Sequence, residues 1–97
     1  MTKIEKQTIR KQYDRLWMEL KEYEWYLATE SGCTEYLQFS KLLASRQAYM
    51  CKLFAWSSVY DLALALNIDL WSEYDPDNEC TRRANEAMDN IWNYFHK

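Results

Sequence analysis

The sequence predicts an all-α protein: an antiparallel helical bundle of three helices, two of them long and one shorter. Turn-forming residues are scarce, with one Gly and one Pro in 97 residues, which argues against an all-β domain. Hydrophobic residues make up 48% of the chain and aromatic residues 16%, a composition too apolar for intrinsic disorder. A chain of this length supports one hydrophobic core, so residues 1–97 are expected to form a single helical domain.

The first helix is predicted from about Lys3 to Glu30. Thr2 and Glu5 have the spacing of a capping box, which satisfies free amides at the start of a helix. Apolar and aromatic side chains then recur at alternating intervals of four and three, as they do on one face of a helix. These side chains are Ile9, Tyr13, Leu16, Leu20, Tyr23 and Leu27. Gly32, the only glycine, supplies the left-handed residue that commonly ends a helix.

The second helix is predicted to be long and continuous, from its cap at Thr34 to Leu66. Its apolar stripe runs from end to end without a change of phase. Asn67 suits a left-handed position after the helix, with Ile68 packing back on the last turn. In the alternative, a new helix starts at the serines, so that the bundle has four helices and the second breaks near Ser57-Ser58.

The third helix is predicted to begin with Asp75 as its cap and Pro76 at its first position, with acids in the first turn facing the positive end of the dipole. Its inner stripe is Ala84, Met88, Ile91 and Phe95. At 1.5 Å per residue the three helices would be about 42, 52 and 31 Å long. The third helix is therefore too short to cover the hairpin that the first two form.

Because the third helix is expected to run antiparallel to the second, it should leave the end of the hairpin near Gly32 open. Large aromatic side chains gather at that end, and aromatic residues are enriched at interface hot spots. The predicted partner-binding residues of this aromatic end are Tyr23, Trp25, Tyr26, Tyr36 and Phe39. In the alternative, the same residues form an ordinary hairpin core.

Charge is unevenly distributed although the net charge is only −3. Acids dominate residues 58–80 and bases dominate residues 1–15, a polarity that can orient a partner. The predicted acidic stretch for partner binding is Asp69, Glu73, Asp75, Asp77 and Glu79. The alternative nucleic-acid-binding stripe is Lys6, Arg10, Lys11 and Arg15. Helix capping alone also explains the acids that precede the third helix.

No residue pattern indicates catalysis, a metal or a cofactor. His96 is the only histidine, and Cys33 has no neighbouring base that would make it a nucleophile. The three cysteines are too widely spaced for a structural zinc site. Residues 75–86 have the acid spacing of a calcium-binding loop, but Cys80 stands where that loop needs Gly. We therefore expect a non-enzymatic protein without catalytic or metal-binding residues.

The sequence favours a cytoplasmic location. The charged N-terminal residues are not followed by the apolar stretch of a signal peptide. An odd number of cysteines without a Cys-x-x-Cys spacing indicates reduced thiols. The longest apolar run, around residues 62–66, is far shorter than the roughly 20 residues that cross a bilayer, so no membrane partner is expected.

Two classes of function remain. In the first, the protein is a small intracellular protein-interaction module that dimerises or binds another protein through its aromatic end. An acidic chain of this kind suits an inhibitor that occludes a basic groove of a nucleic-acid-handling enzyme. Phage-encoded anti-CRISPR proteins often act in this way, and the comparison concerns the general kind of protein rather than a shared motif. In the alternative, it is a small nucleic-acid-binding regulator that uses the basic stripe of its first helix.

Overall fold

The computed structural model describes residues 2–70 and 78–96, which form four α-helices and no strand. These are α1 (Lys3–Ser31), α2 (Tyr36–Ser45), α3 (Gln47–Ala65) and α4 (Glu79–Phe95). The predicted all-α bundle is therefore confirmed.

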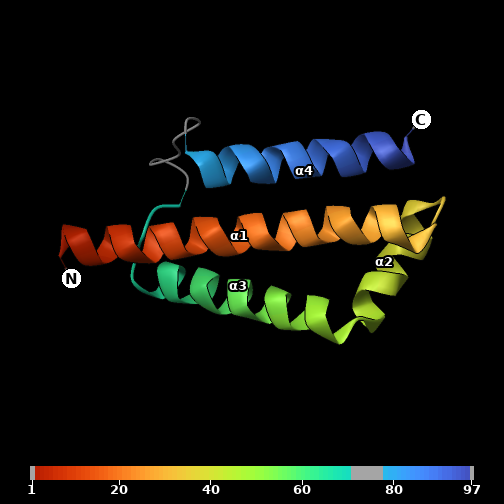
Figure 1. The fold of residues 1–97 in the computed structure, drawn as a ribbon. Coiled ribbons are helices and arrows are strands. Elements are labelled where there is room, and N and C mark those ends of the chain that lie inside the picture. Colours follow the sequence, from red (N-terminus) through yellow and green to blue (C-terminus); the bar gives the residue numbers. More distant parts are fainter. Residues whose placement is uncertain (1, 71–77, 97) are drawn as a thin grey trace.

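The central helix of the bundle is α1, and both α3 and α4 pack against it (Figure 1). α3 runs antiparallel to α1 along one side, while α4 runs parallel to α1 along the other. The short α2 turns the chain between α1 and α3. With extents of 46 × 28 × 15 Å the molecule is flat, so its long helices form a single layer rather than a closed bundle.

The predicted start and end of α1 are confirmed to within one residue. The Thr2 side-chain oxygen accepts a hydrogen bond from the Glu5 amide at 3.2 Å, as a capping residue does. At the other end Gly32 has φ 71°, a left-handed conformation that glycine adopts without the steric cost of a Cβ. Local signals alone therefore account for both ends of the longest helix.

The predicted continuous second helix is wrong, because the chain breaks at Arg46. There φ is −92° and ψ is 116°, an extended conformation that separates α2 from α3. The alternative with four helices has the right number, but α3 runs unbroken through Ser57 and Ser58. The Ser58 hydroxyl donates to the Phe54 carbonyl at 2.8 Å within the helix instead of capping a new one.

The end of α3 is confirmed as predicted. Asn67 has φ 55°, the Ile68 amide donates to the Ala63 carbonyl at 2.9 Å and the Asn67 amide donates to the Leu64 carbonyl at 3.1 Å. This pair of bonds defines a Schellman motif, which satisfies carbonyls at a helix end. It also buries Ile68 against Ala63, so the motif builds part of the core.

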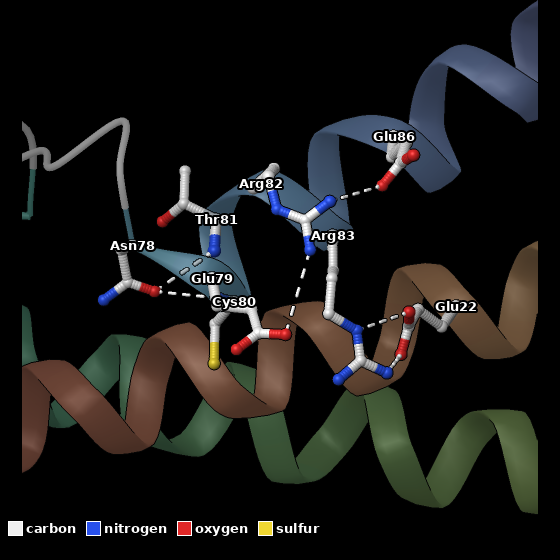
Figure 2. A network of polar contacts seen from close by, with 8 residues as sticks. All are labelled: Glu22, Asn78, Glu79, Cys80, Thr81, Arg82, Arg83 and Glu86. Carbon is white, nitrogen blue, oxygen red and sulfur yellow. Dashed lines mark hydrogen bonds and ion pairs between the residues drawn. The ribbon is translucent and has the colours of Figure 1, made fainter.

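α4 starts later than predicted, at Glu79, with Asn78 as its cap. The Asn78 side-chain oxygen accepts hydrogen bonds from the amides of Cys80 and Thr81, at 2.9 and 3.3 Å (Figure 2). The predicted cap, Asp75, and Pro76 lie outside the described residues. Asn78 takes the capping role because its one side-chain oxygen reaches two free amides of the first turn.

The prediction that the Gly32 end is open is also wrong. α4 begins beside the middle of α1, where Arg83 pairs with Glu22, and runs toward Gly32. At that end Phe95 stacks on Phe39 with ring centroids 5.2 Å apart. The late start at Glu79 places the helix over the aromatic end rather than over the opposite end of α1.

Two buried clusters hold the layer together. The first, between α1 and α2, comprises Leu27, Ala28, Phe39 and Leu43, with Ile91 and Phe95 of α4 packed against it. The second comprises Ala63, Ile68 and Leu70, with Ile9, Tyr13 and Tyr60 packed against it. No helix of the described residues is long and apolar enough to cross a membrane.

Candidate protein-binding groove

A groove runs along α1 beside α4, with α3 on its other side at one end and α2 at the other end. It consists of two cavities of about 510 and 400 Å³ that adjoin at Met88, which lines both. The side chains of α1 that line the cavities recur at intervals of three and four, so they share one face of the helix. They are Arg10, Tyr13, Asp14, Trp17, Lys21 and Glu24. One face of α1 thus forms the floor of the groove.

The smaller cavity is lined by aromatic rings. Trp17 of α1 packs on Trp56 of α3 with ring centroids 5.0 Å apart, and Trp56 stacks on Tyr60 at 5.5 Å. Tyr13 lies 6.1 Å from Trp56, and burial raises the pKa of its hydroxyl. All four rings are half-buried, so they are held by their neighbours yet retain area that a ligand can cover. Such pre-positioned aromatic groups are typical of binding hot spots.

One end of the aromatic cavity is polar. Arg10 is buried, with its guanidinium 3.2 Å from the Asp14 carboxylate and within 3.4 Å of the Asp69 carbonyl oxygen. Burial raises the pKa of Asp14, although the charge of Arg10 opposes that shift. The guanidinium is therefore engaged inside the protein and is not presented to an external phosphate.

The larger cavity carries a second polar pair on its floor. Glu24 is buried, with one carboxylate oxygen 2.9 Å from Lys21 Nζ, while its other oxygen accepts a hydrogen bond from the Tyr49 hydroxyl at 3.3 Å. Burial, together with the charge of Glu24, raises the pKa of Tyr49 to about 12. Lys21 Nζ also lies 4.4 Å from the centroid of the Trp17 ring, within the range of a cation–π contact. This contact links a residue that lines the larger cavity to one that lines the smaller cavity.

Only part of the predicted aromatic end faces solvent. Phe39 is buried in the core, and Tyr23 and Trp25 are half-buried, with Trp25 edge-on to Tyr94 at 5.9 Å. Tyr26 and Tyr36 remain exposed, and Tyr36 lines the larger cavity. The structure therefore uses most of these rings for intramolecular packing, as the alternative of an ordinary core predicted.

The described members of the predicted acidic stretch are Asp69 and Glu79, both of them exposed. Glu79 belongs to an ion-pair network at the start of α4, in which Arg82 lies 3.8 Å from Glu79 and 3.1 Å from Glu86 (Figure 2). The remaining members, Glu73, Asp75 and Asp77, lie outside the described residues.

The predicted basic stripe is exposed at three of its four residues. Lys6, Lys11 and Arg15 are exposed, but Arg10 is buried against Asp14. Arg15 donates a hydrogen bond to Gln12 at 2.9 Å. Arg10 is therefore engaged within the protein, and the other three bases remain exposed.

Within residues 2–70 and 78–96 no group of three or more His, Cys, Asp and Glu side chains could hold a metal ion. Cys33, Cys51 and Cys80 are free thiols, and Cys51 is the exposed one.

Sequence reasoning missed the groove itself. Met88 is expected on the inner stripe of the third helix, and nothing in the sequence pattern brings Trp17 to Trp56 or Glu24 to Tyr49. A usable signal is a second periodic set on α1, which shares Tyr13 with the predicted seam and continues beside it through Trp17, Lys21, Glu24 and Ala28. Because this set mixes aromatic and charged residues, a search for apolar periodicity does not select it.

Comparison with protein-family models, with curated proteins and with solved structures gives no match for this chain. The function is therefore inferred from the groove and its chemistry.

Proposed function

We propose that this protein is a protein-interaction module whose groove binds an amphipathic helix of a partner protein. The observation that carries the proposal is the pair of adjoining cavities along α1, the smaller between α3 and α4 and the larger between α2 and α4. Recognition of a helix in an apolar groove uses anchors spaced by three, four and seven residues, which a row of successive cavities accommodates.

The dimensions of the groove favour a helix as its occupant. Its floor extends from Arg10 to Glu24, which corresponds to about 21 Å of helix axis, or roughly four turns. A partner helix can pack on adjacent helices of the layer, with its axis about 8–10 Å from the axes of the helices that it contacts. Because the molecule is a single layer 15 Å thick, an added helix would bury the face that the layer leaves open.

The chemistry of the groove favours an apolar face on that helix. The rings of Trp17 and Trp56 and the side chains of Met88 and Ile91 are only half-buried. Lys21 and Glu24 neutralise each other on the floor. Aromatic and methionine side chains adapt to apolar anchors, and a neutral floor attracts neither charged peptide ends nor phosphates.

Binding is tested with a display library of helical peptides that carry apolar residues at positions i, i+3 or i+4, and i+7. We expect enrichment on the wild type and loss of binding for Met88→Lys, because the new charge would stand where the two cavities meet. Met88→Leu should retain binding. Tyr26→Ala serves as the matched control, since this exposed ring lines neither cavity.

Far-UV circular dichroism and a thermal melt establish that each variant is folded. A nuclease-treated pull-down from the source cell then identifies the natural partner and is repeated with the same variants. Peptides or partners that bind Met88→Lys as tightly as the wild type would overturn the groove as the binding site.

A narrower form of the proposal places the partner among nucleic-acid-handling enzymes, whose basic groove the acidic stretch would occlude. The net charge of −3 and the exposure of Asp69 and Glu79 support it. Replacing Asp69, Glu73, Asp75 and Asp77 by Lys should abolish binding to such an enzyme and leave helicity intact. Retained binding would contradict occlusion by the acidic stretch, but it would not contradict helix binding in the groove.

A further inference from the structure

We infer that Asp89 and Trp92 of α4 form a subsite, on the rim of the larger cavity, for an arginine of the partner helix. This inference rests on the proposed function, since the arginine belongs to the helix that the groove binds. Asn85 lines the smaller cavity and Trp92 lines the larger one. Asp89 lies four residues after Asn85 and three residues before Trp92, so it shares their face of α4 and borders the groove.

Asp89 is the charged residue of α4 that the fold leaves without a counter-charge. It is exposed and forms no ion pair with another residue of the described ranges. The other charged residues of α4 each lie between 2.6 and 3.8 Å from an opposite charge (Figure 2). These are Glu79, Arg82, Arg83 and Glu86. The carboxylate of Asp89 is therefore available to a cation of the partner.

Trp92 provides an aromatic surface next to that carboxylate. It is 63% exposed although it lines the larger cavity. His96 stacks on its ring with centroids 3.6 Å and planes 15° apart, and His96 Nδ1 lies 2.8 Å from the Trp92 carbonyl oxygen. The indole ring is thus supported by its neighbour and keeps a large open area for a ligand.

The combination of a carboxylate and an indole ring favours arginine. A guanidinium group is planar, so it stacks on aromatic faces and also forms two parallel hydrogen bonds with a carboxylate. Side chains three residues apart on a helix have Cβ atoms about 5–6 Å apart, so one guanidinium can reach both Asp89 and Trp92. Lysine offers a point charge without the planar stacking surface.

The other charges of the groove do not oppose a cation at this place. On the floor, Arg10 pairs with Asp14 and Lys21 pairs with Glu24, so each pair is neutral. Arg82, two turns before Asp89, is paired with carboxylates of its own helix. The partner is thus an amphipathic helix with an arginine at one margin of its apolar face, beside the anchor that enters the larger cavity.

A helical display library with fixed apolar anchors tests the subsite, with Arg, Gln or Glu allowed at the margins of the apolar face. On the wild type we expect enrichment of arginine at one margin. On Asp89→Lys the preference at that margin should change to glutamate, while the same apolar anchors are retained. Glu19→Lys is the matched control, because Glu19 is an exposed acid of α1 that lines neither cavity.

Fluorescence anisotropy then compares one enriched peptide with its counterpart that carries glutamine in place of the arginine. The arginine should strengthen binding to the wild type and to Glu19→Lys by about fivefold or more, as expected for an ion pair combined with a cation–π contact. In Asp89→Asn the gain should fall below about twofold, and Trp92→Leu should also reduce it. Circular dichroism establishes that each variant is folded.

The outcomes separate this inference from the proposed function. Apolar peptides that bind the groove without a preference for arginine would overturn the subsite and leave the groove as a helix-binding site. An arginine preference that persists in Asp89→Lys would overturn the subsite in the same way. If no helical peptide binds the wild type, both the proposed function and the subsite are wrong.

Discussion

Phe95 of α4 stacks on Phe39 of α2 with ring centroids 5.2 Å and ring planes 29° apart. The two residues are far apart in the sequence, and their contact closes the end of the molecule where the chain turns from α1 into α2. Phe39 is 1% exposed, so it is among the most deeply buried side chains of the described structure. At the aromatic end, Phe39 and Phe95 therefore contribute mainly to the hydrophobic core.

Phe39→Ala should destabilise the protein by about 3–5 kcal/mol, because it removes a buried ring and leaves a cavity. Chemical denaturation monitored by circular dichroism measures the loss. Tyr26→Ala is the control, and its cost should stay within about 0.5 kcal/mol because this ring is exposed. Equal losses for the two variants would contradict the assignment of Phe39 to the core.

Tyr49 should titrate at about pH 12, above its usual value of 10, because it is buried and bonded to Glu24. A folded-state pKa above the unfolded value means that the folded protein keeps the proton longer. Tyr49 therefore contributes stability that is fully present below pH 10 and is lost as the pH rises through about 12. Denaturation at a series of alkaline pH values, compared with Tyr49→Phe, measures this contribution.

Glu24→Gln provides the matched test. Removing the negative charge should lower the pKa of Tyr49, although burial keeps it above the usual range. Spectrophotometric titration at alkaline pH, with Tyr49→Phe as reference, isolates this hydroxyl among the tyrosines. An unchanged pKa in Glu24→Gln would show that the carboxylate does not act on Tyr49.

Asn78→Ala should destabilise α4 by about 1 kcal/mol, because the amides of Cys80 and Thr81 lose their acceptor. Asn78→Asp should retain the stability, since aspartate caps helices as well as asparagine does. Thermal and denaturant unfolding of both variants tests the assignment. A loss as large for Asp as for Ala would indicate that Asn78 acts by something other than capping.

Nucleic-acid binding is expected to be absent near physiological salt, because Arg10 is buried against Asp14 and the remaining bases are few. Fluorescence anisotropy with labelled single-stranded and duplex probes at several salt concentrations measures it. Binding with a salt slope that falls by about one for each of Lys6→Ala, Lys11→Ala and Arg15→Ala would instead support the regulator alternative.

The candidate site could be predicted from the sequence only in part. The sequence pointed to an aromatic interaction surface, but it placed that surface at the Gly32 end, where Phe39 and Phe95 in fact pack against each other. The rings that line the groove come from different helices: Trp17 from α1 and Trp56 from α3. Periodicity assigns residues to one face of a helix, but it does not give the distance between the facing surfaces of two neighbouring helices.

The sequence by itself determined the helical class and the ends of helices that depend on neighbouring residues. Thr2, Gly32 and Asn67 act through hydrogen bonds and backbone conformations that span a few residues, so their roles can be inferred locally. Only the tertiary structure decided the break at Arg46 and the position of α4. The physical reason is that these features follow from contacts between distant segments, such as Arg83 with Glu22 and Phe95 with Phe39, whose packing outweighs the modest helix preferences of single residues.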